Sequence, residues 1–224
     1  ELHRPVKIVE EFARTIEKEI DYSIEATHME RFARKFLNDP TIYVPKVFRD
    51  TSTSRVLTME FIDGIKISEI SRLDDAGYDR KIIAVRGADL ALKQVFNNGF
   101  FHADPHPGNI FVLPSNVICL LDFGMMGSVD RQTREDFFDL LDSVVHKDTL
   151  KATRLLLELT DHDEEPDIRL LERDLSDLIG QHLYKRLKDI EIGKMLQGLL
   201  EVASRYRLRI PPDMFLMRKA FSST

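Results

Sequence analysis

The spacing of hydrophobic residues changes along this chain from a helical period to a strand-like one and back. Residues 6–36 contain no Gly or Pro, which favours an uninterrupted helix. Their apolar residues recur at steps of four, at Phe12, Ile16, Ile20 and Ile24. This spacing predicts one long helix over residues 6–36 with a core-facing stripe, ended by Asp39-Pro40.

Strand-like segments follow this helix. Residues 43–48 and 55–61 are rich in β-branched and aromatic residues and flank a polar turn, so we expect two short strands. The second segment ends at Asp63-Gly64, a strand-breaking pair. Residues 79–98 then predict a helix that ends at Asn97-Asn98-Gly99, with an apolar stripe at Ile82, Val85, Ala88, Leu92 and Val95.

Two apolar runs, 109–113 and 117–121, flank the turn residues 114–116 and predict a β-hairpin. After Gly127 the pattern is helical. Expected helix starts lie at Asp130, Asp148 and Pro166, and further helices follow near Ile192 and after Pro211-Pro212. The order of elements predicts an α+β fold.

Polar residues cluster at the two ends of the predicted hairpin. Asp104 precedes it, Asn109 begins it, and Asp122 follows it in the sequence Asp122-Phe123-Gly124. Protein kinases place a catalytic Asp five residues before a metal-binding Asn, and an Asp-Phe-Gly aspartate after the next hairpin. We therefore expect a phosphoryl-transfer site, with Asp104 as catalytic base or water-positioning acid and Asn109 and Asp122 as Mg²⁺ ligands.

Other positions in this pattern are candidates for binding ATP. Glu60 and Ile62 lie where a kinase strand leaves the small lobe and where backbone groups bind adenine. His106 lies where many kinases have a lysine that contacts phosphate, so a phosphate contact is expected there.

Composition fits a globular protein with a substantial core, since 43% of the 224 residues are hydrophobic and 31% are charged. The formal net charge of −6 gives no basic signature for nucleic acid. The single cysteine, Cys119, lies in an apolar run and predicts a buried core residue. No apolar run reaches membrane-spanning length.

With these motifs in place, the chain resembles the UbiB family of atypical kinase-like proteins, which are tied to ubiquinone biosynthesis. The resemblance rests on residues 19–26 (Glu-Ile-Asp-Tyr-Ser-Ile-Glu-Ala), 102–109 and 121–127. It implies a protein-kinase-like fold, with a partial small lobe over residues 1–61 and a mainly helical large lobe over residues 62–224. It also implies Mg²⁺ and ATP as cofactors.

The resemblance gives roles to three acids of the first helix. Glu19 and Asp21 are expected toward nucleotide and metal, and Glu25 is expected to pair with a strand lysine. We expect a carboxylate of Glu19 or Asp21 within about 4–6 Å of Asp122, bridged by metal. The family usually has Asn where this chain has His28, and its lysine motifs would precede Glu1. The chain is therefore interpreted as a fragment that lacks the front of its small lobe.

The expected partners are ATP, quinone-precursor lipids, ubiquinone-biosynthesis proteins and a membrane surface, with no nucleic acid. A basic bias over residues 185–219 fits either a lipid-facing patch or a solvated helical face. The expected location is the cytoplasmic side of an inner membrane, reached through segments outside this chain, or else a mitochondrion or plastid. Two other functions stay open: a small-molecule phosphotransferase of the aminoglycoside or choline kinase type, and a non-enzymatic pseudokinase scaffold.

Overall fold

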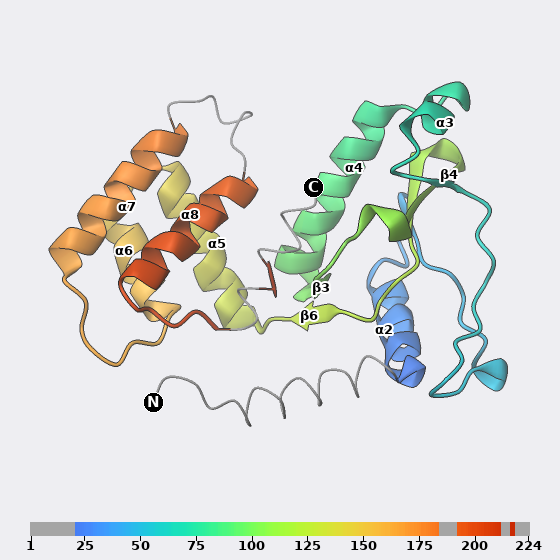
Figure 1. The fold of residues 1–224 in the computed structure, drawn as a ribbon, viewed down its shortest axis with the longest axis horizontal. Helices are drawn as coiled ribbons and strands as arrows, with labels where there is room; N and C mark the ends of the chain where they lie inside the picture. Colours follow the sequence, from blue (N-terminus) through green and yellow to red (C-terminus); the bar gives the residue numbers. More distant parts are fainter. Residues whose placement is uncertain (1–20, 184–191, 212–215, 218–224) are drawn as a thin grey trace. The chain divides into compact units, whose positions relative to one another are not determined.

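A computed structural model of the chain describes residues 21–183, 192–211 and 216–217 (Figure 1). The chain separates into two compact units. Unit 1 is formed by residues 1–90 and 104–126, and unit 2 by residues 91–103 and 127–224. The expected lobe boundary at residue 61 stays a prediction. Within the described ranges, no helix is long and apolar enough to cross a membrane.

Unit 1 combines helices with a four-stranded sheet of order β1-β5-β4-β2. β1 pairs with β5 in parallel, whereas β4 is antiparallel to both β5 and β2. Its helices and 3₁₀ turns are α2 (Tyr22–Lys35), η1 (Arg49–Thr51), α3 (Ile70–Asp75), α4 (Arg80–Leu92, whose last two residues belong to unit 2), η3 (Pro107–Asn109) and η4 (Pro114–Asn116). Its strands are β1 (Ile42–Tyr43), β2 (Ile65–Lys66), β4 (Ile110–Leu113) and β5 (Val117–Leu120).

The predicted hairpin is confirmed as β4 and β5. The two strands run antiparallel, with Ile110 opposite Leu120 and Leu113 opposite Val117. The turn between them holds Ser115 and Asn116 at positive φ, 64° and 58°. The Asn is one of the residue types that tolerate this conformation, as the sequence indicated.

The described residues of unit 2 form helices and a small two-stranded sheet of β3 and β6 (Figure 1). The elements are the π-helical turn η2 (Lys93–Asn98), β3 (Phe100–His102), β6 (Met126–Ser128, whose first residue belongs to unit 1), α5 (Arg131–Val145), α6 (Thr149–Glu158), α7 (Ile168–Leu183) and α8 (Ile192–Arg205). The Asp130 side chain caps α5 by accepting from the Thr133 N–H, and that of Asp148 caps α6 by accepting from the Lys151 N–H. Both caps were predicted, because Asp accepts from free amides in a first helical turn.

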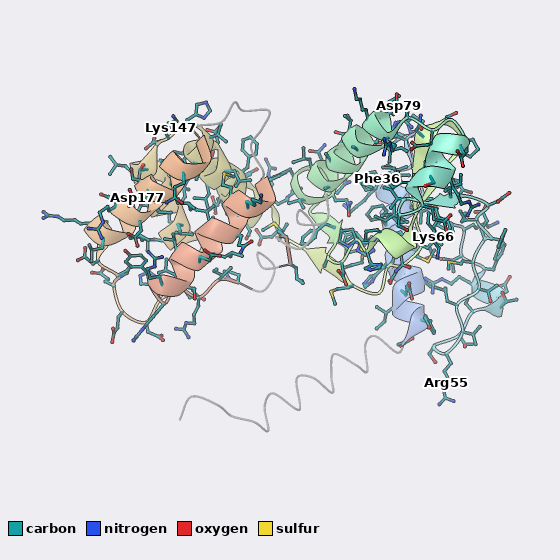
Figure 2. The ribbon with its side chains drawn as sticks, turned by 45° about the horizontal axis from the view of Figure 1, so that its top comes forward. Phe36, Arg55, Lys66, Asp79, Lys147 and Asp177 are labelled. Carbon is teal, nitrogen blue, oxygen red and sulfur yellow. The ribbon has the colours of Figure 1, made fainter. Side chains whose placement is uncertain are left out.

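The side chains in Figure 2 show how the described residues divide between core and surface. Phe36, only 6% exposed, lies inside unit 1, whereas Arg55 extends from an exposed loop. Lys147 and Asp177 lie on the surface of the helical unit.

Three sequence expectations need correction. The expected helix over residues 6–36 does not continue through Asp21, which is the non-helical N-cap of α2 (φ −91°, ψ 94°). An Asp side chain competes for backbone amides and so favours a helix start over a helix interior. The part of this expectation that covers residues 6–20 lies outside the described residues.

The second correction concerns the two expected strands. The segments 43–48 and 55–61 do run antiparallel, but only one isolated bridge, Val47 with Met59, joins them. Two hydrogen bonds flank this bridge, from Phe48 N to Thr58 O at 2.9 Å and from Glu60 N to Lys46 O at 2.8 Å. The turn between the segments begins with η1, and the segments themselves form no extended ladder.

The third correction concerns α4. Val85 is 70% exposed and Ile82 is 41% exposed, so the expected stripe is not the buried face of this helix. Ile83 and Leu90 are buried instead. α4 itself ends at Leu92 and continues as the π-helical turn η2, whose C-cap Gly99 adopts the left-handed conformation (φ 56°), at the predicted end of the helical segment.

Candidate functional site

The β4–β5 hairpin brings two of the predicted metal ligands together. Asn109 directly precedes β4, and Asp122 lies two residues after the end of β5. Antiparallel pairing of the strands therefore leaves both residues at the open end of the hairpin. The Asn109 side-chain amide donates to Asp122 Oδ2 at 2.9 Å, and Leu121 N donates to Asn109 O at 3.0 Å.

The second oxygen of Asp122 is also held. Gly124 N donates to Asp122 Oδ1 at 2.9 Å, closing a tight turn over the carboxylate. An adjacent carboxylate and amide supply the hard oxygen atoms that Mg²⁺ prefers. No cluster of three or more His, Cys, Asp or Glu suited to a metal ion occurs in the part of the chain that the structure describes. Mg²⁺ sites usually have few protein ligands, with water and phosphate as the others.

Asp104 begins a loop that is hydrogen-bonded to itself. His106 N donates to the Asp104 carbonyl at 2.7 Å, and Asn109 N donates to the His106 carbonyl at 2.9 Å. The His106 side chain accepts from Gly108 N through Nδ1 at 3.0 Å. Both Asp104 and His106 are exposed side chains of unit 1, the unit that also contains Asp122.

Two polar side chains of helix α2 contact the backbone of the Asp-Phe-Gly segment. Glu25 Oε1 accepts from Phe123 N at 3.0 Å, and His28 Nδ1 lies 2.9 Å from the Phe123 carbonyl oxygen. Burial, together with the charge of the nearby Asp122, raises the pKa of Glu25, although the N–H of Phe123 opposes this shift. The expected pairing of Glu25 with a lysine stays a prediction.

Sequence reasoning missed the position of His28. The only signal was that this chain has His where the family usually has Asn. Its contact with Phe123 joins residues 95 positions apart, which no local pattern reveals.

The other two acids of the first helix have different outcomes. Glu19 lies outside the described residues. The Asp21 carboxylate accepts from the N–H and the hydroxyl of Ser23, at 2.9 and 2.5 Å. These hydrogen bonds lower the pKa of Asp21. The expected approach of a Glu19 or Asp21 carboxylate to Asp122 stays a prediction.

The two candidates for adenine contact lie after the Val47–Met59 bridge. The Glu60 carboxylate accepts from the Tyr43 hydroxyl at 2.9 and 2.8 Å and from Lys46 N at 3.1 Å. The hydrogen bond to Glu60 raises the pKa of the Tyr43 hydroxyl. The Glu60 side chain therefore ties its segment to β1, while Ile62 is half-buried.

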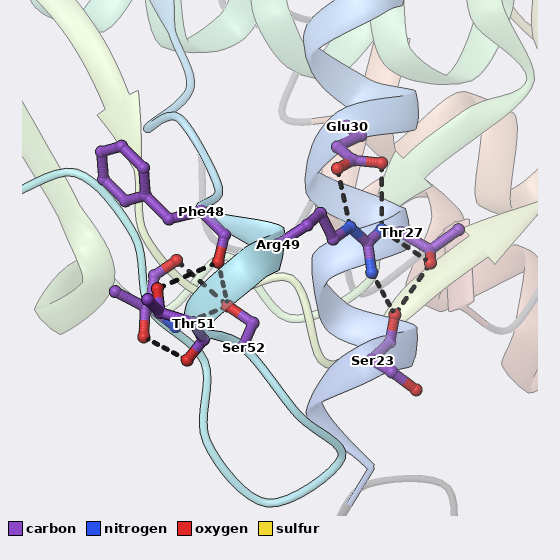
Figure 3. A network of polar contacts seen from close by, with 8 residues as sticks. Ser23, Thr27, Glu30, Phe48, Arg49, Thr51 and Ser52 are labelled. Atoms are coloured by element: carbon purple, nitrogen blue, oxygen red, sulfur yellow. Dashed lines mark hydrogen bonds and ion pairs between the residues drawn. The ribbon is translucent and has the colours of Figure 1, made fainter.

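A polar network fixes the loop at residues 48–52 against α2 (Figure 3). The Arg49 guanidinium donates to both carboxylate oxygens of Glu30, at 2.8 and 2.9 Å, and to Thr27 Oγ1 at 3.1 Å. A bidentate pair has a fixed geometry. Arg49 thus supports the face of α2 that carries Thr27 and Glu30.

Two family models match the chain. The ABC1 atypical kinase-like domain matches residues 1–156, and the UbiB helical domain matches residues 175–223. A solved structure of Rv3197 from Mycobacterium tuberculosis, in complex with erythromycin, superposes with a TM-score of 0.58 at 18% identity. The match covers 96% of this chain and 57% of that one, and it confirms the expected mixed α+β, kinase-like fold.

Two curated relatives match over nearly all of the chain. It is 35% identical over 222 residues to Protein ACTIVITY OF BC1 COMPLEX KINASE 7, chloroplastic, of Arabidopsis thaliana, covering 97% of this chain and 32% of the relative. It is 32% identical over 222 residues to the probable protein kinase UbiB of Pseudomonas fluorescens (strain Pf0-1), covering 97% and 42%. The chain thus spans well under half the length of these relatives. Since the family model covers most of its residues, the chain belongs to the ABC1 atypical kinase-like family, and it includes the UbiB helical domain.

Proposed function

We propose that the protein is a Mg²⁺-dependent, ATP-binding atypical kinase or ATPase. The observation that carries this proposal is the hydrogen bond from Asn109 to Asp122, 2.9 Å long, at the open end of the hairpin. It holds an amide and a carboxylate at the spacing from Asp104 that phosphoryl-transfer enzymes use. Membership of a kinase-like family supports the same reaction class.

Asn109 and Asp122 would hold Mg²⁺ against the nucleotide phosphates. When bound, the ion neutralises charge on those phosphates. Asp104 is exposed and carries the carboxylate that accepts the proton of the acceptor hydroxyl or positions water. Since Nδ1 of His106 accepts a hydrogen bond, a neutral His106 ring carries its proton on Nε2, where it can donate to phosphate.

The remaining candidates belong to the nucleotide side of the site. Backbone groups near Glu60 and Ile62 would bind adenine, since the Glu60 carboxylate is bonded to Tyr43 and Lys46. Glu19 and Asp21 would approach nucleotide and metal. Glu25 would pair with a lysine of the full-length protein.

The names of two relatives support the proposed biological setting. One is named a probable protein kinase UbiB and another a chloroplastic kinase, which supports a role in ubiquinone or related quinone biosynthesis. Quinone-precursor lipids, ubiquinone-biosynthesis proteins and a membrane surface are the proposed partners. The proposed location is an inner membrane, or its mitochondrial or plastid counterpart. The alternatives are a pseudokinase scaffold and a small-molecule phosphotransferase.

The test is Asp122→Asn in the full-length protein. We expect this variant to lose magnesium-dependent ADP binding, measured by calorimetry, because an amide cannot replace the charge of a Mg²⁺ ligand. Asp177→Asn changes an exposed carboxylate of the helical unit in the same way and should bind like the wild type (Figure 2). Equal affinity in the two variants would contradict the proposal.

A further inference from the structure

One residue of the Asp-Phe-Gly segment is contacted by α2 at its amide, its carbonyl and its ring. The amide of Phe123 donates to Glu25 Oε1 at 3.0 Å, and the carbonyl oxygen of Phe123 lies 2.9 Å from His28 Nδ1. The Phe123 ring meets the Phe32 ring edge to face, with centroids 5.2 Å apart and an interplanar angle of 65°. One helix therefore sets both the position and the rotation of Phe123.

The three α2 residues form a regular face of that helix. Residues 25, 28 and 32 are three and four positions apart, the spacing that places side chains on one side of a helix. Phe32 and Phe123 are both 0% exposed, and Phe36 stacks on Phe32 at 4.6 Å. The aromatic contacts anchor α2 on the core side, which leaves Glu25 and His28 to fix the backbone of Phe123.

One peptide group connects the His28 contact at the Phe123 carbonyl with the Asp122 carboxylate. The Phe123 carbonyl and the Gly124 N–H belong to the same peptide, which is planar and trans. That N–H donates to Asp122 Oδ1 at 2.9 Å. Rotation of this peptide would therefore break the His28 contact and the Asp122 contact together. A donor on the carbonyl also polarises the peptide and strengthens its N–H as a donor.

We propose that His28 is a positioning residue for Asp122. It donates from Nδ1 to the Phe123 carbonyl and so holds the peptide whose N–H orients the carboxylate. A carbonyl oxygen can only accept, so His28 carries a proton on Nδ1. This inference rests on the proposed function only where it concerns magnesium, since the orientation of the peptide can be measured without a ligand.

Side-chain geometry supplies a matched pair of variants. The Nδ2 of Asn is as many bonds from the backbone as the Nδ1 of His, so His28→Asn keeps a donor at the same reach. Leu has nearly the shape of Asn but no donor. His28→Asn should therefore preserve the contact, and His28→Leu should remove it.

The first measurement uses the ligand-free full-length protein. In the wild type, ¹⁵N NMR should show His28 with its proton on Nδ1. The Gly124 amide should exchange with solvent about tenfold faster in His28→Leu than in the wild type or His28→Asn, because its hydrogen bond loses its support. A proton on Nε2 alone, or equal exchange in all three proteins, would overturn the proposal.

The second measurement is the Mg²⁺ concentration that gives half-maximal ADP binding. Residues that orient metal ligands typically contribute 10–100-fold to metal affinity, so His28→Leu should need about tenfold more Mg²⁺. His28→Asn should stay within about threefold of the wild type. Binding of ADP in EDTA should be the same in all three proteins.

Arg49→Met is the control for general disturbance of α2, because the hydrogen bonds of Arg49 go to Thr27 and Glu30 of this helix. The positioning role would be overturned if Arg49→Met raised the Mg²⁺ concentration for half-maximal ADP binding as much as His28→Leu does. If the wild type itself shows no magnesium-dependent ADP binding, the proposed function fails, whereas the tautomer and the amide exchange still decide the role of His28.

Discussion

Asp104 and Asp122 are carboxylates of one unit that differ in exposure. Asp122 accepts from Asn109 and Gly124, while Asp104 is exposed at the start of its loop. A carboxylate held by neighbouring donors suits a metal ligand with a fixed orientation. An exposed carboxylate suits a group that meets the acceptor.

The role of Asp104 predicts a separation of turnover from binding. In the full-length protein, Asp104→Asn should lower kcat by about 100-fold or more, because the amide cannot accept a proton. The Kd for ADP with Mg²⁺ should stay within about threefold, since the proposed role of this side chain concerns the acceptor and not the nucleotide. Steady-state turnover measures kcat, and calorimetry measures the Kd for ADP. Collapse of affinity with unchanged kcat would contradict the role.

Cys119 is a buried core residue, as the sequence predicted. It is 0% exposed, and burial raises the pKa of its thiol to about 12. At pH 8 the thiolate fraction is therefore about 1000-fold below that of a thiol with the ordinary pKa of 9.0. Labelling of the native full-length protein with iodoacetamide, followed at Cys119 by mass spectrometry, should be slower by at least this factor than labelling in denaturant. Comparable rates would show that the residue is accessible.

At the scale of elements, the pairing of β3 with β6 depends on Gly127 of β6, which has no side chain. A Cβ at Gly127 would lie 2.3 Å from Cζ of Phe101, whose ring is fully buried. Nothing lies within 4 Å of a Cβ at Gly180 in α7. The same substitution should thus have opposite effects at the two sites.

Gly127→Ala should destabilise the protein by about 1–3 kcal/mol, because the Phe101 ring must move in a packed core. Gly180→Ala should stabilise it by about 0.5–1 kcal/mol, because Ala loses less backbone entropy in a helix. Denaturant unfolding followed by circular dichroism measures both. A loss of stability in Gly180→Ala, or none in Gly127→Ala, would contradict the described packing.

Elements with local signals were predicted well. The caps at Asp130 and Asp148 and the turn at Asn116 depend on residues within a few positions of one another. The stripe of α4 failed because helical spacing shows that a face is apolar and does not show which face meets other elements. Ile83 is 4% exposed and Val85 is 70% exposed, although both are aliphatic residues of one helix.

At the scale of the whole molecule, the candidate site residues that the structure describes all belong to unit 1. Hydrogen exchange of the full-length protein with ADP and Mg²⁺ should therefore show protection chiefly over residues 22–36 and 104–126. Bound ligand suppresses local opening of the segments that hold it. Protection mainly in α5–α8 would place the nucleotide in the other unit and contradict the site.

The sequence by itself determined the kinase-like family and most of the main elements. The separations of Asp104, Asn109 and Asp122 and the hairpin between two of them are local features, and these motifs also indicated the kinase-like family. Only the tertiary structure decided which groups meet across long separations. It brought Glu25 and His28 to Phe123 and Arg49 to Glu30. The physical reason is that hydrophobic periodicity constrains one element at a time, whereas a contact between distant elements depends on how their buried faces pack together.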